Sequence, residues 1–402
     1  MKEGWKIATL GDVLAVLKNG VNCKQDKSGQ GQKISRIESI AAATFDMSRV
    51  GYASLSEADR KKYRLEKGDI LFSHINSAIH VGKTATFDID EDVYHGVNLL
   101  LMRPKPEVAS GFLNMYLKHL FEMGYWRTRC KQSVNQASVN QQDINRVPIR
   151  YPQNHSEQRR IVTILDEALE NIATAKSNAE KNLQNAHEVF EGHVRSMFSR
   201  LSPVSEDLQL GELCEFVRGP FGGSLTKSNF VSDGYAVYEQ QHAIYDQFDE
   251  VRYFVGEAKF NEMKRFELHP GELIMSCSGT MGRVAIVPKG IRKGIINQAL
   301  LKLSPMPSVL NSYLKYWMTS EGFQNALSEY SGGAAIQNVA SVKVLKEIRV
   351  PLPSLEEQSK AVESIDSMFT EIERLETLYQ QKIETLGDLK QSLLHRAFNG
   401  DL

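Results

Sequence analysis

The sequence repeats itself after about 200 residues, and this duplication restricts the possible folds more than any other feature. LGDV at residues 10–13 matches LGEL at 210–213, and GKTA at 82–85 matches GRVA at 282–285. Three longer matches also occur in the same order in both halves: 67–73 with 270–276, 113–118 with 310–315, and 152–158 with 353–358. A period this long indicates a duplicated domain rather than a solenoid, whose repeats are much shorter.

Each half begins with about 150 residues of mixed character. Short apolar runs bounded by Gly, Pro and Asn predict strands, and a helical pattern follows them in each half. The expected strands are 69–73, 97–102, 273–276, 284–287 and 299–303, and the expected helices are 112–121 and 310–318. Proline-containing strands at 147–152 and 348–353 close the two regions. The fold class expected is therefore mixed α/β (α+β), in two similar domains.

After each closing strand the apolar residues recur every three or four positions, from Ile161 to Met197 and from Val362 to Leu393. This spacing is typical of a coiled-coil seam, which Leu375, Leu378 and Leu389 widen in the second half. A helix over 157–200 would extend about 66 Å and needs a partner along its seam, for which the second copy is the obvious choice. Ser156 and Ser354 lie where N-caps belong. Two ordinary core helices, each broken once, are the alternative.

Charge and composition exclude several protein classes. The net charge is −1, which argues against a small, strongly basic DNA-binding domain. The charge is unevenly distributed, however: residues 1–152 carry net +6 and residues 354–402 net −5. An acidic helical end suits contact with protein more than with phosphate. No apolar run approaches the ~18 residues of a membrane span and no signal peptide is evident, so we expect a cytoplasmic protein. Four widely spaced cysteines predict reduced thiols.

The motifs of common catalytic sites are missing. No Walker A sequence occurs, and the glycine-rich loop at 219–224 lacks the Gly-Lys-Ser/Thr that ends one. Ser278 is not in a G-x-S-x-G nucleophile elbow, and the histidines show no metal-binding spacing. Glu257-Ala258-Lys259, after Asp246 and Asp249, resembles a metal-nuclease E-x-K but is expected by chance in a chain with this many charges. The sequence favours a binding protein over an enzyme.

Several segments together resemble the specificity subunit of a Type I restriction–modification enzyme. The resemblance is carried by the repeated openings at 5–12 and 208–212, the loop FGGSLTKS at 221–228, the junction VPLPSLEEQ at 350–358 and the helix end LLHRAFNGDL at 393–402. The first junction, YPQNHSEQ at 151–158, lacks the Pro-x-Pro. The similarity covers nearly the whole chain.

The resemblance implies two target recognition domains, each reading one half of a bipartite site in double-stranded DNA, and two long antiparallel helices between them. We expect the first recognition domain at 1–154, its spacer helix at 155–202, the second recognition domain at 203–353 and its spacer helix at 354–402. Two modification subunits would dock on the helices, and motor-nuclease subunits would join them. S-adenosylmethionine, ATP and Mg²⁺ would bind those partners. This chain would hold no cofactor, metal or catalytic residue.

Residues that read DNA should be Arg, Lys, Gln and Asn at base edges, with further Lys, Arg and Ser at phosphates. In the first half the candidates are Ser77, Lys83, Arg127, Arg129, Lys131, Gln132, Asn135 and Gln136. In the second half they are Ser224, Thr226, Lys227, Gln240, Gln241, Ser278, Thr280, Arg283, Gln337, Asn338 and Lys343. A coiled-coil adaptor whose duplicated domains bind protein instead of DNA remains the alternative function, and a self-sufficient metal nuclease is a third.

Overall fold

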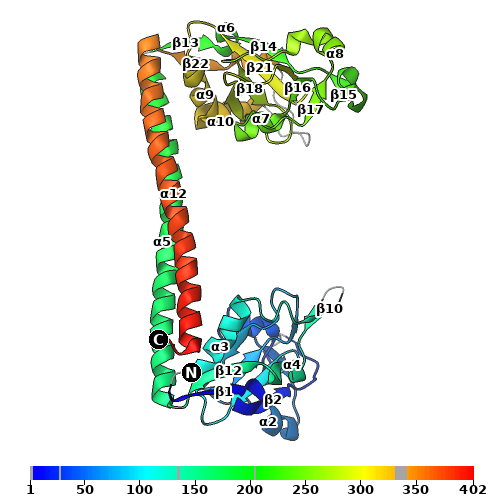
Figure 1. The fold of residues 1–402 in the computed structure, drawn as a ribbon, viewed down its shortest axis with the longest axis vertical. Coiled ribbons are helices and arrows are strands. Elements are labelled where there is room, and N and C mark those ends of the chain that lie inside the picture. The colour runs from blue at the N-terminus through cyan, green and yellow to red at the C-terminus, as the bar shows by residue number, and fades with distance from the viewer. Residues whose placement is uncertain (1–2, 27–28, 134–135, 203–204, 331–341) are drawn as a thin grey trace. The chain divides into compact units, whose positions relative to one another are not determined.

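The computed structural model describes residues 3–26, 29–133, 136–202, 205–330 and 342–402. It divides into two compact units (Figure 1). Unit 1 comprises Met1–Asn178 with Lys382–Leu402, and unit 2 comprises Ala179–Gln381. Each unit therefore contains one mixed region and one end of each long helix.

Unit 1 is built on a four-stranded antiparallel sheet in the order β2-β9-β5-β7. These strands are β2 (Leu14–Asn19), β9 (Leu100–Pro104), β5 (Ile70–Phe72) and β7 (Thr84–Thr86). The pair β1 (Trp5–Thr9) and β12 (Pro148–Pro152) lies apart from it, as does a sheet of β4 (Gly51–Ala53), β3 (Gln32–Ile34) and β8 (Val93–Tyr94). The helices are α1 (Leu10–Val13), α2 (Glu57–Tyr63), α3 (Ser110–Glu122) and α4 (Gln141–Asn145), with 3₁₀ turns η1 (Ile37–Ile40) and η2 (Met47–Arg49).

Unit 2 repeats this plan with the strand order β14-β21-β18-β19, again antiparallel. Its strands are β14 (Cys214–Arg218), β21 (Leu300–Pro305), β18 (Leu273–Ser276) and β19 (Val284–Ile286). The pair β13 (Glu206–Gln209) and β22 (Arg349–Leu352) corresponds to β1 and β12, and a further sheet contains β15 (Phe230–Val231), β17 (Tyr253–Val255), β16 (Tyr235–Tyr238) and β20 (Gly294–Ile296). The helices are α6 (Leu210–Leu213), α7 (Gln240–Tyr245), α8 (Glu257–Glu262), α9 (Asn311–Thr319), α10 (Glu321–Tyr330) and α11 (Val342–Glu347), with 3₁₀ turns η4 (Gly222–Ser224), η5 (Lys227–Asn229) and η6 (Lys264–Phe266). The predicted duplication and mixed fold class are confirmed.

The repeated Gly-Lys/Arg sequence has a structural cause in the β5–β7 and β18–β19 connections. The Ser73 amide bonds the Lys83 carbonyl at 2.8 Å, and the Ser276 amide bonds the Arg283 carbonyl at 2.9 Å. Gly82 lies between them with φ +94°, and a Cβ there would lie 2.1 Å from Cδ1 of Trp126. Only glycine fits such a position, because it tolerates both the left-handed backbone and the contact.

The predicted long helices are α5 (His155–Leu201) and α12 (Leu355–Asn399), and each is a single helix. In unit 1, Ile161 at the start of α5 shares a buried apolar cluster with Ala397 at the end of α12. In unit 2, Phe198 at the end of α5 shares one with Ile365 near the start of α12. The helices therefore run antiparallel. The alternative of two broken core helices is wrong.

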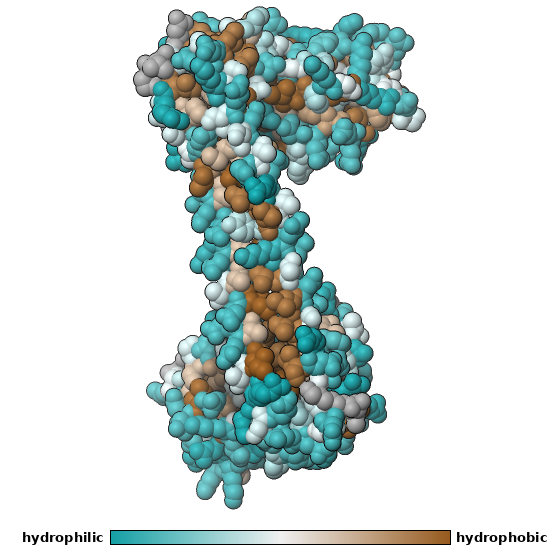
Figure 2. All heavy atoms as spheres, turned by 60° about the vertical axis from the view of Figure 1, so that its left-hand side comes forward, coloured by the Kyte–Doolittle hydropathy of each residue, from teal (hydrophilic) through white to brown (hydrophobic). Residues whose placement is uncertain are grey.

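The coiled-coil seam buries only part of the apolar stripe. Ala179, Ala186 and Ile372 are buried, whereas Leu378 and Leu389 are about half exposed, at 48% and 46%. Phe369 is 43% exposed and Val189 57% exposed. Figure 2 shows the apolar surface that results along the helices. Phe369 nevertheless packs against Phe190 of α5, with ring centroids 5.8 Å apart. The exposed part of Phe369 and the exposed Val189, Leu378 and Leu389 form surface that the pairing of α5 with α12 leaves uncovered.

One helix start differs from expectation. Ser354 caps α12 as predicted, since its backbone N–H and Oγ–H both bond Oε2 of Glu357 and its Oγ accepts from the Glu357 amide. The prediction of Ser156 as the cap of α5 is wrong, because α5 begins at His155. Asn154 accepts from the Ser156 amide through Oδ1 at 2.8 Å instead. An Asn side chain can satisfy a free first-turn amide as well as a Ser can. The N-cap of α5 is therefore Asn154, two residues before Ser156.

Cys214 and Cys277 are buried free thiols, and Cys23 and Cys130 are half-buried ones. In the described part of the chain no helix has the length and apolar character needed to cross a membrane.

Candidate nucleic-acid interface

Three of the first-half candidates, Lys131, Gln132 and Gln136, lie on a small antiparallel ribbon of unit 1. It contains β10 (Lys131–Ser133), β11 (Gln136–Ser138) and β6 (Ile75–Asn76), in that order. Ala137 of β11 is buried and pairs with Asn76 of β6, while Lys131, Gln132 and Gln136 are exposed. A β-ribbon fits the major groove of B-DNA, where amide and basic side chains reach base edges. Backbone pairing has thus brought the end of β6, which Ser77 follows, next to β11 and β10.

Arg127 and Arg129 precede the ribbon in a turn anchored by the buried Trp126. The guanidinium of Arg129 lies 3.9 Å from the ring centroid of Tyr125, and its Nη1 donates to the Tyr125 carbonyl at 3.4 Å. Both arginines are exposed. They directly precede β10 in the chain.

Lys83 is less free to reach DNA than the neighbouring candidate Ser77. Its Nζ donates to the Ala41 carbonyl at 2.9 Å, and its side chain is half-buried. Ser77 is exposed at the end of β6, where its amide bonds Oδ1 of Asn76 at 2.8 Å. Lys83 would have to give up its backbone contact to reach DNA, whereas Ser77 would not.

Eight of the second-half candidates fall into three groups in unit 2. Ser224, Thr226 and Lys227 are exposed on η4 and η5. The β18–β19 connection carries Thr280 and Arg283, both exposed, and Ser278, which is half-buried. Helix α7, which begins with Gln240 and Gln241, packs against β18 and β19.

Lys343 is exposed on α11. Asn135, Gln337 and Asn338 lie outside the described residues. Unit 2 therefore offers exposed polar candidates in the described residues of η4, η5 and the β18–β19 connection, and half-buried ones on α7.

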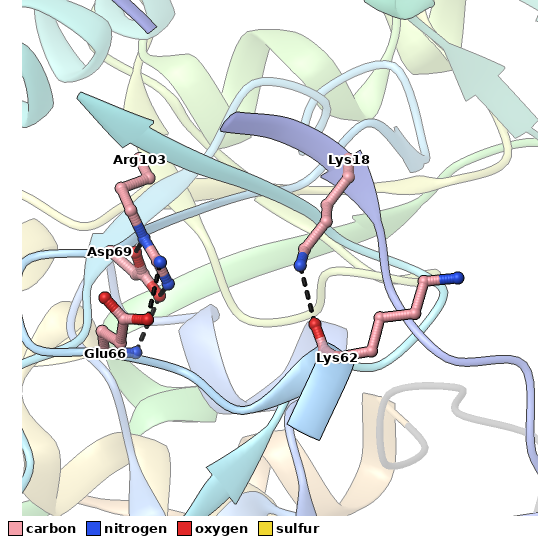
Figure 3. A network of polar contacts seen from close by, with 5 residues as sticks. All are labelled: Lys18, Lys62, Glu66, Asp69 and Arg103. Carbon is pink, nitrogen blue, oxygen red and sulfur yellow. Dashed lines mark hydrogen bonds and ion pairs between the residues drawn. The ribbon is translucent and has the colours of Figure 1, made fainter. Parts of the chain in front are cut away.

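Other charged side chains in unit 1 have structural roles, as Figure 3 shows. Arg103 binds Asp69 through two hydrogen bonds of 2.7 and 2.9 Å, and Asp69 is almost fully buried. The Lys18 amine donates to the Lys62 carbonyl at 2.8 Å. The hydrogen bonding of the Arg103 guanidinium to the Asp69 carboxylate is the main reason that the pKa of Arg103 is raised. These cations are committed to the fold and are poor candidates for phosphate contacts.

Sequence reasoning missed a chain of three hydrogen-bonded polar side chains, Gln141, Asn19 and His74. Nε2 of Gln141 donates to Oδ1 of Asn19 at 2.7 Å, and Nδ2 of Asn19 lies 3.2 Å from Nε2 of His74. Asn19 ends β2, and His74 follows β5. Burial lowers the pKa of His74 to about 4, so its ring is neutral and its Nε2 accepts the Asn19 hydrogen. The available signal was the position of His74, which directly follows the repeated segment 67–73.

The metal-nuclease arrangement is not assembled. Lys259 pairs with Glu262 at 2.8 Å, and Asp246 pairs with Lys315 at 2.6 Å. No group of three or more His, Cys, Asp and Glu side chains among the described residues could hold a metal ion. The E-x-K triplet is therefore accounted for by ordinary surface ion pairs.

Comparison with known proteins agrees with this architecture. The model of the Type I restriction modification DNA specificity domain matches residues 2–184 and 205–385, that is, once in each half. The chain belongs to this family. Family members are the non-catalytic recognition subunits of Type I restriction–modification systems and contain two target recognition domains, so the chain is not itself an enzyme.

Two curated relatives match over most or all of the chain. A Methanocaldococcus jannaschii protein named for the MjaX specificity subunit is 29% identical, covering 93% of this chain and 89% of its own length. The EcoKI specificity subunit of Escherichia coli is 21% identical, covering 100% of this chain and 90% of its own length.

Solved structures show the same fold. A chain from a study of complex assembly and conformational transition in the type I R-M system superimposes with a TM-score of 0.73, at 16% identity and coverage of 100% and 99%. The HsdS subunit from Thermoanaerobacter tengcongensis gives a TM-score of 0.66, at 18% identity and coverage of 100% and 98%.

Proposed function

We propose that this specificity subunit reads a bipartite site in double-stranded DNA, with one half-site assigned to each half of the chain. The observation that carries the proposal is that two units of the same fold present different polar side chains at corresponding loops. Units that share a backbone but differ at their exposed residues can read unlike sequences, so the site need not be a palindrome.

We place the recognition domains at 1–154 and 203–353, and the spacer helices at 155–202 and 354–402. The proposed DNA contacts of the described residues are the exposed candidates of the ribbon, η4, η5, α11 and the β18–β19 connection. Their mixture of basic and amide groups suits a division between phosphate contacts, which fix register, and base contacts, which specify sequence.

We further propose that two modification subunits dock on α5 and α12. The support is apolar surface that the pairing of these helices leaves uncovered, including Val189, Phe369, Leu378 and Leu389 (Figure 2). The net charge of −5 over residues 354–402 favours a protein partner over DNA on that helix. S-adenosylmethionine, ATP and Mg²⁺ belong to the modification and motor-nuclease subunits in this proposal, and the complex acts in the cytoplasm.

The test is a mobility-shift titration of the full chain, with its modification subunits, on duplexes of random sequence at increasing salt. Binding through phosphates releases counterions, so the logarithm of the association constant should fall linearly with the logarithm of salt concentration. A steep negative slope supports DNA reading. Absence of any shift at low salt would establish the protein-binding adaptor instead. Cleavage of the duplexes by the isolated chain with a divalent metal would establish the nuclease.

A further inference from the structure

The registers of the two main sheets place Asn19 and Arg218 at the same position in the fold. In unit 1, Asn19 of β2 pairs with Leu100 of β9, which pairs with Phe72 of β5. In unit 2, Arg218 of β14 pairs with Leu301 of β21, which pairs with Met275 of β18. Both residues end the outer strand of their sheet and precede a glycine, Gly20 or Gly219, that lies against neighbouring backbone.

The side chain that supports each of them is also equivalent. His74 comes two residues after Phe72, and Cys277 comes two residues after Met275. Each follows the repeated serine, Ser73 or Ser276, whose amide bonds the next strand. Each unit therefore has a polar side chain at the end of its outer strand and a buried side chain that supports it. The two side chains are Asn19 and His74 in unit 1, and Arg218 and Cys277 in unit 2.

In unit 1 this position holds the carboxamide of Asn19, which is hydrogen-bonded to the carboxamide of Gln141 and whose orientation is fixed by His74. The neutral His74 ring accepts from Nδ2 of Asn19, which leaves Oδ1 of Asn19 to accept from Gln141. The contact uses one amide hydrogen of Gln141 and leaves its Oε1 and its other hydrogen. His74 is only 6% exposed, and its Nδ1 has no hydrogen-bond partner within the described residues.

In unit 2 the same position holds a cation. The half-buried Arg218 guanidinium lies beside the Cys277 thiol, whose pKa burial raises to about 11, so that the thiol is neutral and does not balance the charge. Nη1 of Arg218 is buried and has no hydrogen-bond partner within the described residues. A buried donor left unpaired costs free energy that an acceptor on a ligand would recover.

We propose that this shared position determines specificity, with Gln141, held by Asn19, reading an adenine in one half-site and Arg218 reading a guanine in the other. The inference rests on the proposed function and names the bases that two of its side chains would recognise. A carboxamide matches the N6 donor and N7 acceptor of adenine, and a guanidinium matches the O6 and N7 acceptors of guanine. His74 and Cys277 act as positioning residues that touch no base.

The experiment measures methylation by the chain assembled with its modification subunits, using duplexes that carry the recognised site with each base pair varied in turn. Gln141→Ala should lower discrimination at one A·T pair by roughly ten- to a hundredfold and leave every other position unchanged. Gln141→Glu should move the preference at that pair toward C·G, because a carboxylate accepts from N4 of cytosine. Arg218→Gln should change one G·C preference in the opposite half-site toward A·T.

Matched controls are Gln142→Ala, the exposed neighbour of Gln141 on α4, and Arg265→Ala, an exposed arginine of unit 2. Both should keep the original base profile. An unchanged profile in the Gln141 and Arg218 variants would overturn the inference. Equal weakening at all base pairs would also overturn it, since that is the signature of phosphate contact or lost structure.

Failure of the inference is distinguishable from failure of the proposed function. If the unsubstituted complex shows no base preference, the proposed function is wrong, whatever the variants do. If it shows a bipartite preference that Gln141→Glu does not alter, only the inference is wrong. Gln141 is half-buried on the short surface helix α4, so its substitution tests the proposal even if Arg218→Gln fails to fold.

Discussion

Two glutamines hold the junctions between the mixed regions and the long helices. Gln158 is fully buried, where its Oε1 accepts from the Ala109 amide at 2.7 Å and its Nε2 donates to the carbonyls of Glu107 and Pro152. Gln358 makes the equivalent bonds with Leu310, Ser308 and Pro353. Each glutamine thus satisfies three backbone groups that would otherwise be buried without partners, which explains why the repeat retains it.

Replacing Gln358 with Leu should destabilise unit 2. The substitution keeps the volume but orphans one backbone N–H and two carbonyls, each costing about 1–3 kcal/mol, so a total loss of roughly 2–4 kcal/mol is expected once some groups regain water. Faster amide hydrogen exchange throughout unit 2, measured by mass spectrometry on the full chain, would show it. Gln391→Leu, at an exposed position of the same helix, is the control and should have little effect.

Two buried histidines should make unit 1 sensitive to mild acid. Burial lowers the pKa of His74 to about 4 and of His95 to about 3, below the ordinary value of 6.5. The unfolded chain therefore binds protons below about pH 6.5 that the native chain does not, so stability is complete above this pH and is lost as pH falls. Between pH 6 and pH 5 the loss should be on the order of 2 kcal/mol.

Urea unfolding of the full chain at the two pH values measures this loss. In a Trp317→Phe variant, Trp5 and Trp126 report on unit 1 alone. His74→Gln should reduce the pH dependence, because the amide does not titrate. A urea midpoint that stays constant from pH 6 to pH 5 would contradict neutral native histidines.

At the scale of elements, the sequence predicted β5, β9, β18, β19, β21 and the two long helices to within a few residues, but not β2, β7 or β14 of the main sheets. The spacing of apolar residues was enough to predict these elements, because the apolar positions are also the buried ones. It did not predict the ribbon of β10, β11 and β6, whose residues are mostly exposed and polar and so carry no burial pattern. Most of the candidate contacts in 127–136 could be found from composition, but Asn19, His74 and Gln141 come together only through sheet register.

The start of α5 offers a direct test of local structure. Asn154→Ala should cost about 1 kcal/mol of stability, because Asn154 accepts from the Ser156 amide, while Ser156→Ala should cost less than about 0.5 kcal/mol. Thermal unfolding of the two variants, followed by circular dichroism, compares them. A larger effect of Ser156→Ala would restore Ser156 as the cap.

At the scale of the whole molecule, the long helices have two tasks that different residues perform. Buried residues such as Ile161, Phe198 and Ile365 hold α5 against α12. Leu378 and Leu389 remain about half exposed on α12 and are available for a partner. Family membership and the duplicated fold account for the architecture, and the docking assignment extends them to this exposed face.

Leu378→Asp combined with Leu389→Asp should therefore weaken assembly with the modification subunits without unfolding the chain. A charge placed on an apolar interface must be desolvated without a partner, so we expect at least a tenfold weaker association. Sedimentation of the mixed subunits measures it, with circular dichroism as the check on folding. The matched control is Glu373→Gln, at an exposed position of the same helix. Assembly at unchanged affinity would remove the docking assignment.

The central claim is that each half of the chain reads its own half-site, and an exchange of one recognition region tests it most directly. Residues 203–353 would be replaced by the corresponding region of a relative with a different target, and methylated adenines would be mapped genome-wide in cells carrying either version. The account predicts two short specified blocks separated by an unspecified gap, with only one block changed by the exchange. A single uninterrupted site, or a change in both blocks at once, would contradict it.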